Sequence, residues 1–300
     1  MTSLEDVFGS TTTLMIKQKF EALEALANAA SQAIGMDALG ALGETANRYD
    51  VLTDDGGLKF RVVEESELCG FTGRCCCRPN HKLQLHVFHG GEEVLYMDRG
   101  CKCGQCCACT DLCRQEMRVY KGPGEQGLLA HIKAPFMGGG LSPTLQVMDR
   151  DEAPVATIRA NAVCCIGGMC CDHTFQIVDA NGTNIGKIVK ERPDSIAQVA
   201  AEMVGDSDNF TIHVPAGMPP EQKAAILAAM HLIDYWLFED EGAIDANAVE
   251  GSIACKLCDL YCCGCVSPCS CQLGGGNGDD DNDGDGDGDG GDYGGDDGGD

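Results

Sequence analysis

The chain repeats one local pattern, in which an alternation of apolar and polar residues is broken by turn residues and then resumes. In the clearest copy, residues 83–89 lead to Gly90-Gly91, and the chain returns toward Arg99. Such segments are typical of half-buried β-hairpins. Further copies cover residues 145–159, 175–189 and, more loosely, 117–124. The sequence therefore predicts about ten or more antiparallel strands, which is consistent with an up-and-down barrel.

Three clusters of cysteines lie in the segments that connect these hairpins. Hairpins that run up and down return every connecting segment to the same end of the sheet, so we expect all three clusters at one pole of the barrel, opposite the turns at Gly90 and Gly182. A pole rich in thiols indicates either a lipid-anchored face or a metal-bound face. The clusters are Cys69 with Cys75–Cys77, then Cys101 to Cys113, and then Cys164, Cys165, Cys170 and Cys171.

The charge of the chain excludes some partners. The formal net charge is −26 over 300 residues, and residues 279–300 hold eleven aspartates and no basic residue. The rest of the chain is also acidic, which argues against electrostatic capture by nucleic acid or by an anionic membrane. We therefore expect no nucleic-acid partner. Membrane contact would be hydrophobic, lipid-anchored or bridged by a divalent cation.

The N-terminus and the cysteines together predict a compartment. Residues 1–6 have neither a basic n-region nor an apolar h-region, so a secretory signal is not expected. The 21 cysteines are then expected to be reduced thiols on the cytosolic side of a membrane. Adjacent reduced thiols are substrates for S-acylation or ligands for zinc. Met1-Thr2 lacks the glycine that N-myristoylation needs.

Two helices are expected. Apolar residues at three- and four-residue steps over Leu14–Ala30 predict an amphipathic helix that packs on the barrel. The segment from Lys223 to Phe238 is the most hydrophobic helix, yet it is shorter than a spanning helix, and Asp234 would be costly in a bilayer interior. It is expected to be buried inside or against the barrel.

The pattern divides the chain into four parts. Residues 1–48 form an N-terminal helix with a Gly/Ala-rich extension, and residues 49–240 form the barrel with its buried helix at 221–239. Residues 241–273 are a second cysteine-rich segment. Residues 274–300 are a Gly/Asp tail that has too few apolar residues to order and is expected to be disordered.

Six motifs follow one another along the chain, at residues 14–26, 47–51, 74–79, 103–109 with 115–116, 206–210 and 232–239. In this order they resemble the phospholipid scramblase family, whose domain has a tubby-like fold. The resemblance covers roughly Leu14 to Asp240, and it implies a mainly β fold of twelve antiparallel strands enclosing a hydrophobic C-terminal helix, with an N-terminal helix. The proline-rich N-terminal region of the family is absent, and the cysteine-rich segment and acidic tail are additions.

By this resemblance, Cys103, Cys106, Cys107 and Cys109 are the lipidation candidates. One acyl chain gives marginal membrane binding and two or more give stable anchoring, so closely spaced cysteines suit that role. Zinc is the alternative, because Cys103 and Cys106, and likewise Cys255 and Cys258, have ligand spacing. The choice between zinc, acylation and structural thiols stays open for Cys255, Cys258, Cys262 and Cys263.

The resemblance also implies a calcium loop at residues 206–217. Tested as an EF-hand, the loop has Phe210 at position 5 and Gly217 at position 12, where oxygen ligands are required. We expect at most weak calcium binding by Asp206, Asp208 and Asn209. Residues 210–214 alternate like a strand, so a polar turn before a barrel strand is an equal alternative.

Two main functions follow from these features. The first is a scramblase-like protein on the cytoplasmic face of the plasma membrane or another cellular membrane, with calcium-dependent, bidirectional movement of phospholipids between leaflets. The second is a palmitoyl-anchored lipid-binding or signalling adaptor without transport activity, acting through protein partners. A zinc-stabilised soluble β protein is a third alternative. We find no Gly-rich phosphate loop, nucleophile elbow or Ser/His/Asp set, so bond chemistry is not expected.

Overall fold

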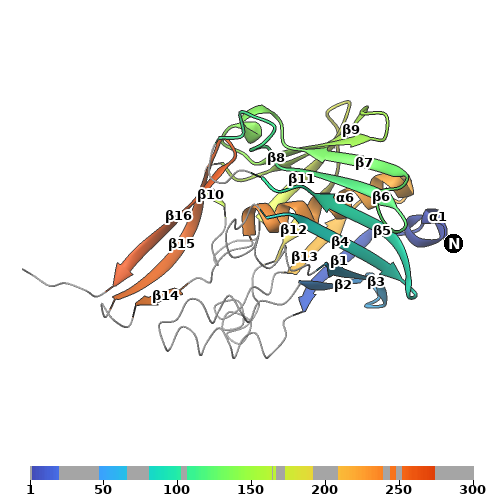
Figure 1. The fold of residues 1–300 in the computed structure, drawn as a ribbon, viewed down its shortest axis with the longest axis horizontal. Helices are drawn as coiled ribbons and strands as arrows, with labels where there is room; N and C mark the ends of the chain where they lie inside the picture. The colour runs from blue at the N-terminus through green and yellow to red at the C-terminus, as the bar shows by residue number, and fades with distance from the viewer. Residues whose placement is uncertain are drawn as a thin grey trace, which may run out of the picture.

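Twelve antiparallel strands close into a barrel in this computed structural model (Figure 1). Each barrel strand pairs with the next along the chain, and the last pairs with the first. The structure describes residues 2–19, 47–65, 81–102, 107–163, 165–166, 173–191, 209–238, 244–247 and 252–273. The predicted fold class is thus confirmed. The barrel strands are β1 (Thr13–Lys19), β2 (Arg48–Leu52), β3 (Leu58–Glu64), β4 (Leu83–His89), β5 (Glu92–Arg99), β6 (Glu116–Lys121), β7 (Leu128–Lys133), β8 (Thr144–Asp149), β9 (Pro154–Ala160), β11 (His173–Asp179), β12 (Asn184–Lys190) and β13 (Asn209–His213).

The predicted hairpins form because their period of two matches the two faces of a strand. In β4, Leu83, Leu85 and Val87 are fully buried and alternate with half-buried polar residues. The turn to β5 places Gly90 and Gly91 at φ values of 58° and 88°. Positive φ at both central residues characterises a tight hairpin turn whose twist matches that of the strands, and glycine adopts it without strain.

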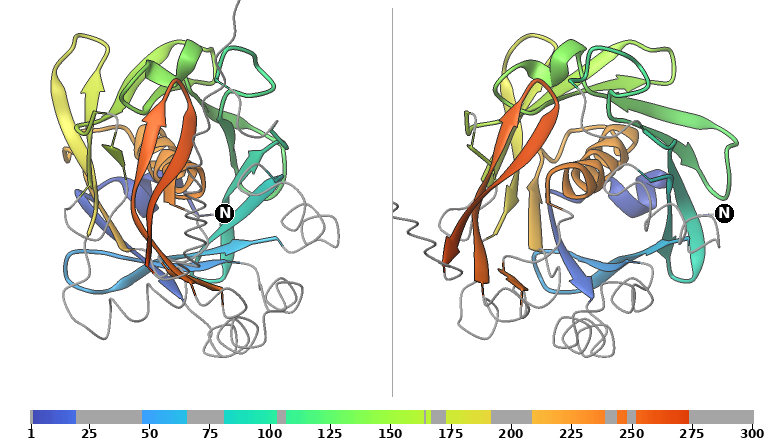
Figure 2. Two further views of the ribbon diagram at one scale, coloured as in Figure 1. Left: turned by 90° about the vertical axis from the view of Figure 1, so that its left-hand side faces the viewer. Right: turned by 60° about the vertical axis from the view of Figure 1, so that its left-hand side comes forward.

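A buried helix fills the barrel. Helix α6 (Pro220–Ile233) continues as one turn of π-helix, η2 (Asp234–Phe238), and all residues from Lys223 to Phe238 are buried. In the right-hand view of Figure 2, α6 lies inside the ring of strands. The helix begins at Pro220 because proline tolerates the first turn, where no backbone N–H bond is required. The predicted buried helix at 221–239 is confirmed for the described residues up to 238.

A short N-terminal helix, α1 (Leu4–Phe8), packs beside the start of α6 (Figure 2). Ser3 caps it, because its hydroxyl accepts the Asp6 backbone N–H while the Asp6 carboxylate accepts the Ser3 backbone N–H. The buried Lys223 ammonium donates to the carbonyl oxygens of Phe8 at 3.1 Å, Gly9 at 2.9 Å and Ala216 at 3.1 Å. This one side chain thus joins α6, the C-terminal end of α1 and the loop before α6. Burial lowers the pKa of Lys223.

The predicted helix over Leu14–Ala30 is wrong for its described part, because residues 14–19 belong to β1. Leu14 and Ile16 are buried while Lys17 is exposed, which is a strand alternation. β1 is also the strand that closes the barrel between β13 and β2, so residues 47–51 enter the second strand rather than the first. The barrel consequently begins well before residue 49. Residues 20–30 lie outside the described part.

A second, smaller sheet is formed by the segment after the barrel. Its strands are β10 (Cys165–Ile166), β14 (Ile244–Asn247), β15 (Ser252–Cys262) and β16 (Cys265–Leu273). β15 pairs with all three other strands. Since β10 follows β9 in the chain, its pairing with β15 joins the small sheet to the barrel. In Figure 1 the β15–β16 hairpin runs beside the barrel, with its turn near one end of β8. The predicted tail at 274–300 lies outside the described residues.

Lys223→Met should lower the free energy of unfolding by about 2–3 kcal/mol, because three buried carbonyl oxygens lose a charged donor. Urea denaturation measures the change. Lys187→Met is the matched control, since Lys187 is an exposed lysine on β12. Equal stability of the two variants would contradict the role of Lys223.

His231→Leu should flatten the acid dependence of stability. His231 is fully buried against Tyr49, with ring centroids 4.7 Å apart, and neither ring nitrogen has a hydrogen-bond partner. Burial lowers the pKa of His231 to about 3. Between about pH 6.5 and pH 3 the unfolded chain binds a proton that the folded chain lacks, so stability falls by about 1 kcal/mol per unit as the pH falls.

Urea denaturation of both proteins at pH 7, 6 and 5 tests this expectation. The wild type should lose more stability than His231→Leu across this range. An equal loss of stability in the two proteins would contradict the expectation that burial keeps His231 uncharged in the folded state.

Candidate functional site

All connections between the predicted hairpins meet at one end of the barrel. The barrel strands are antiparallel and follow chain order, so the segments after β3, β5, β7, β9 and β12 leave from the same end. The turns at Gly90 and Gly182 lie at the opposite end. We name the first end the cysteine pole and the second the hairpin pole. The common location of the strand ends that flank the three cysteine clusters is therefore confirmed.

The turn of the β15–β16 hairpin docks on the cysteine pole. The Ala108 backbone N–H donates to the Cys263 carbonyl oxygen at 2.8 Å, and the Cys263 N–H donates to the Gly140 carbonyl oxygen at 2.7 Å. The buried Tyr261 hydroxyl donates to the Gly138 carbonyl oxygen at 2.7 Å. Gly138 belongs to the short 3-10 helix η1 (Phe136–Gly139) between β7 and β8. The hairpin turn is thus held by the connections that follow both β5 and β7.

The docking requires glycine at the contact. Gly264 has a φ of 94°, and a Cβ atom there would lie 2.6 Å from the Ala108 Cβ atom. Gly138 has a φ of 60°, and its Cβ would lie 2.8 Å from the Gly264 Cα atom. Tyr261 completes the contact by packing its ring edge-on against Trp236 of η2, with centroids 5.6 Å apart.

The docked turn brings together thiols that are far apart in sequence. Cys107 and Cys109 come from the β5–β6 connection, and Cys262, Cys263 and Cys265 come from the hairpin turn. The Cys262 and Cys263 sulfur atoms lie 3.5 Å apart. The hydrogen bond from the Ala108 N–H to the Cys263 carbonyl oxygen holds the two cysteine-bearing segments together.

Three of these thiols, Cys109, Cys263 and Cys265, have a raised pKa. A hydrogen bond with Cys107 raises the pKa of Cys109, and a hydrogen bond with Cys262 raises the pKa of Cys263. Burial, followed by the neighbouring Cys107, raises the pKa of Cys265. Reactive cysteines have lowered pKa values, because the thiolate is the nucleophile. The cluster is therefore not suited to nucleophilic catalysis.

The structure places some of the predicted lipidation and zinc residues and not others. Cys107 is half-buried and Cys109 exposed, whereas Cys103 and Cys106 lie outside the described residues. Cys262 is exposed and Cys263 half-buried. Cys255 lies on β15 opposite Cys271, and Cys258 lies opposite Cys269. Sequence reasoning included Cys265 in the second cysteine-rich segment but missed Tyr261 and Gly264, although both lie among those cysteines in one short turn.

The zinc prediction is not tested by the structure. Among the described residues, no group of three or more His, Cys, Asp or Glu side chains could hold a metal ion. Cys103 and Cys106 lie outside that part of the chain, so zinc stays a prediction. Cys113 is disulfide-bonded, so the expectation that every cysteine is a reduced thiol is wrong at this residue.

The predicted calcium loop does not fit an EF-hand. Asn209 and Phe210 begin β13, where Asn209 pairs with Lys17 of β1 and the Phe210 side chain is buried in the core. A strand in the barrel wall cannot wrap around an ion, so the twelve-residue loop from 206 to 217 is excluded. The strand predicted at residues 210–214 is confirmed over residues 210–213. Asp206 and Asp208 lie outside the described residues.

A buried polar belt lies beneath the cysteine pole and holds the end of α6. The Tyr235 hydroxyl donates to the Glu64 carboxylate at 2.9 Å, and the Asn47 amide donates to Tyr235 at 3.0 Å. Buried Arg99 donates to the His81 carbonyl oxygen at 2.9 Å. Buried charges are stable only when hydrogen-bonded in this way. The belt therefore fixes where the chain leaves the barrel.

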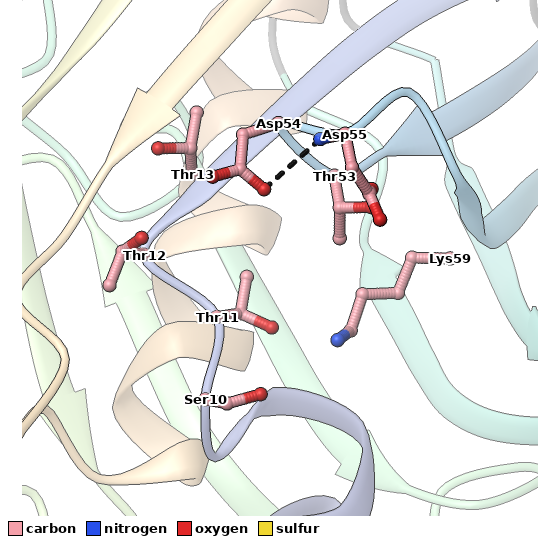
Figure 3. A pocket seen from close by; sticks show the side chains of 8 residues that line it. All are labelled: Ser10, Thr11, Thr12, Thr13, Thr53, Asp54, Asp55 and Lys59. Atoms are coloured by element: carbon pink, nitrogen blue, oxygen red, sulfur yellow. Dashed lines mark hydrogen bonds between the residues drawn. The ribbon is translucent and has the colours of Figure 1, made fainter.

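A polar pocket of about 240 Å³ lies at the hairpin pole (Figure 3). The Thr11 hydroxyl is buried without a hydrogen-bond partner, and the Thr53 hydroxyl lowers the pKa of Asp55 by donating to it. Burial lowers the pKa of Lys59. The lining mixes one cation with two acids, so it favours neither sign of ligand. It is lined by Ser10, Thr11, Thr12, Thr13, Thr53, Asp54, Asp55 and Lys59.

No helix in the described part of the chain combines the length and the apolar character that a membrane crossing needs.

The class of protein is a closed, twelve-stranded antiparallel barrel that encloses a buried helix, with cysteine-bearing connections at one pole. The family model Scramblase matches residues 4–240, so the chain belongs to the Scramblase family. The match covers every barrel strand and α6, and it ends before the β15–β16 hairpin.

Curated relatives agree with this assignment. The chain is 27% identical to human phospholipid scramblase 1 over 203 residues, which is 67% of this chain and 59% of the relative. It is 28% identical to bovine phospholipid scramblase 2 over 229 residues, 75% of this chain and 68% of the relative. It is 29% identical to human phospholipid scramblase 4 over 199 residues, 65% of this chain and 56% of the relative. No solved structure matches the chain.

Gly264→Val should undock the hairpin turn, because the new side chain would overlap Ala108. We expect several-fold faster maleimide labelling of half-buried Cys107 and Cys263, measured by peptide-resolved mass spectrometry. Gly91→Val is the matched control, since Gly91 also has positive φ, at 88°, but nothing lies within 4 Å of its Cβ position. Labelling of Gly264→Val at the wild-type rate would contradict the docking.

Proposed function

We propose that this protein is a phospholipid scramblase-like protein that moves phospholipids in both directions between the leaflets of a membrane. The observation that carries the proposal is the Scramblase match, which extends over the whole barrel and α6. The relatives named phospholipid scramblase support it at 27–29% identity. The chain spans about three fifths of the length of human phospholipid scramblase 1, so the activity of that whole protein is carried over as part of the proposal.

The proposed mechanism takes place at the surface of the barrel. The interior is filled by α6, whose residues pack into one core with the inward faces of the strands. Lipids would therefore move past the outside of the barrel while it is held against the membrane. Acyl chains on Cys103, Cys106, Cys107 and Cys109 would hold the cysteine pole there, because two or more chains give stable anchoring.

Localisation and calcium are parts of the same proposal. The acyl-anchored pole would place the protein on the cytoplasmic face of the plasma membrane or another cellular membrane, with phospholipid as its partner and no nucleic acid. Weak calcium binding by Asp206, Asp208 and Asn209 would stimulate lipid movement. Carboxylate and amide oxygens are the ligands that calcium prefers.

A palmitoyl-anchored adaptor without transport activity is the second candidate. The filled barrel interior favours it, since this interior offers no polar path along which a headgroup could move. An adaptor would use the same acylated pole and present the rest of the barrel to protein partners.

Lipid flipping by the full chain in liposomes decides between the two. Fluorescent phospholipid in the outer leaflet is quenched chemically, and lipid that reaches this leaflet from the inner one is then lost from the signal. We expect loss of the protected signal that is faster with calcium than with a chelator. Asp206→Ala/Asp208→Ala should reduce the calcium stimulation and leave the basal rate.

The control is Asp54→Ala/Asp55→Ala, which removes two exposed acids at the hairpin pole. It should retain the calcium stimulation. No flipping in either condition, by protein that co-floats with the liposomes, would reject scrambling and favour the adaptor.

A further inference from the structure

Exposed large hydrophobic side chains gather at the cysteine pole. Phe136 is 64% exposed, Leu112 68% and Val163 61%. Among the described residues, every exposed large hydrophobic except Leu58 belongs to this end. Leu58 follows the β2–β3 turn and lies at the hairpin pole. We name the set at the cysteine pole the apolar rim, which comprises Leu112, Phe136, Met137, Leu141, Val163 and Leu260.

The segments that carry the apolar rim contact one another. The Met137 N–H donates to the Ala108 carbonyl oxygen at 2.9 Å, which joins the β5–β6 and β7–β8 connections. The Ser142 hydroxyl donates to the Ala162 carbonyl oxygen at 3.1 Å, which joins them to the segment after β9. Leu260 pairs with Cys165 of β10. The rim is therefore one surface built from four connected segments.

Among the described residues, the segments of this surface carry charge only at their borders, as with Asp111 and Arg114 on either side of Leu112, in a chain that is strongly acidic. Residues 107–110, 134–143, 161–163 and 260–269 contain no charged side chain, although charged residues make up 23% of the chain and its net charge is −26. At the border of the rim, Asp111 is neutralised by Lys133 at 3.0 Å and by Arg114. Between the segments, neighbouring thiols raise the pKa of Cys109 and Cys263, which favours the uncharged form of these two side chains.

We propose that the apolar rim is the surface by which this protein docks on a phospholipid bilayer, with Phe136 and Leu141 inserted below the headgroups. An exposed apolar patch marks a site of interaction with a protein or a membrane, and the Scramblase match, with relatives named phospholipid scramblase, favours the membrane. The acidic remainder of the chain is repelled by an anionic surface, so an uncharged face is the one that can approach it.

The hairpin is part of this surface. Leu260 and the exposed Cys262 belong to residues that follow the Scramblase match, so this chain extends the membrane-facing end beyond the family domain. The docked orientation stands the barrel upright, with the end of α6 toward the bilayer and the polar pocket at the hairpin pole away from it. The inference rests on the proposed function for the location at a membrane, and it is independent of lipid flipping.

Tryptophan fluorescence tests which end touches lipid. The chain has a single tryptophan, Trp236, which is buried and gives a constant background. Phe136→Trp and Leu58→Trp each add one exposed tryptophan, at opposite poles. With phosphatidylcholine vesicles, emission of Phe136→Trp should shift to the blue and be quenched by brominated acyl chains. Leu58→Trp should show neither effect.

Vesicle flotation measures the contribution to binding. Phe136→Asp/Leu141→Asp should reduce partition of the unacylated full chain into phosphatidylcholine vesicles by roughly tenfold or more, since two large apolar side chains no longer enter the interface. Leu58→Asp should partition as the wild type does. Circular dichroism checks that all variants are folded.

Three outcomes would overturn the inference, and a fourth would reject only the proposed scrambling. Vesicle binding without quenching of Phe136→Trp would place the contact elsewhere on the molecule. Absent vesicle binding, together with self-association that Phe136→Asp/Leu141→Asp abolishes, would assign the rim to a second copy of the chain. Quenching without flipping would reject scrambling and keep the docking, whereas flipping without quenching would reject the docking alone.

Discussion

The fold depends on burial of an all-apolar helix inside a closed sheet. Twelve strands enclose an interior that is too wide for their own side chains to fill, so a filler is needed. Helix α6 supplies it because alanine, leucine and isoleucine surround the helix on every side, with no face left for water. The polar groups of this helix are confined to its ends and to His231. Lys223 is held by carbonyl oxygens at one pole, and Tyr235 by the polar belt at the other.

The direction of α6 decides at which end of the barrel the C-terminal segment emerges. Because α6 runs from the hairpin pole to the cysteine pole, the chain leaves the barrel at the end where the cysteine-bearing connections already meet. The β15–β16 hairpin then folds back on that end, and Gly264 and Gly138 permit the backbones to touch. Thiols and exposed apolar side chains consequently share one surface. The opposite pole has a polar pocket and the compact α1 contact, and Leu58 is its exposed large hydrophobic among the described residues.

The hairpins and the buried helix could be predicted because their sequence patterns lie within short segments of the chain. The hairpins at residues 83–99, 145–159 and 175–189 were predictable because the period of two and the turn residues coincide. The buried helix was predictable from its continuous apolar run. The segment Leu14–Lys19 was misread because Leu14, Met15 and the apolar residues after it satisfy helical spacing as well as strand alternation. Its pairing with β13, nearly the whole domain away, decides the outcome. The contact of Gly264 with Ala108 could not be predicted for the same reason, because the two residues are far apart in the sequence and no local pattern specifies their contact.

The pairing of β1 with β13 has a consequence for how the protein is made. β1 leaves the ribosome before the other barrel strands, yet its partner at residues 209–213 and the filling helix at 220–238 are synthesised after all of them. Until then the growing chain is an open sheet with two unpaired edges and a solvent-exposed apolar face, which is a state prone to association with other strands. Contacts of such large sequence separation also fold slowly. The nascent chain is therefore expected to depend on chaperones until the last segment of the barrel has been released.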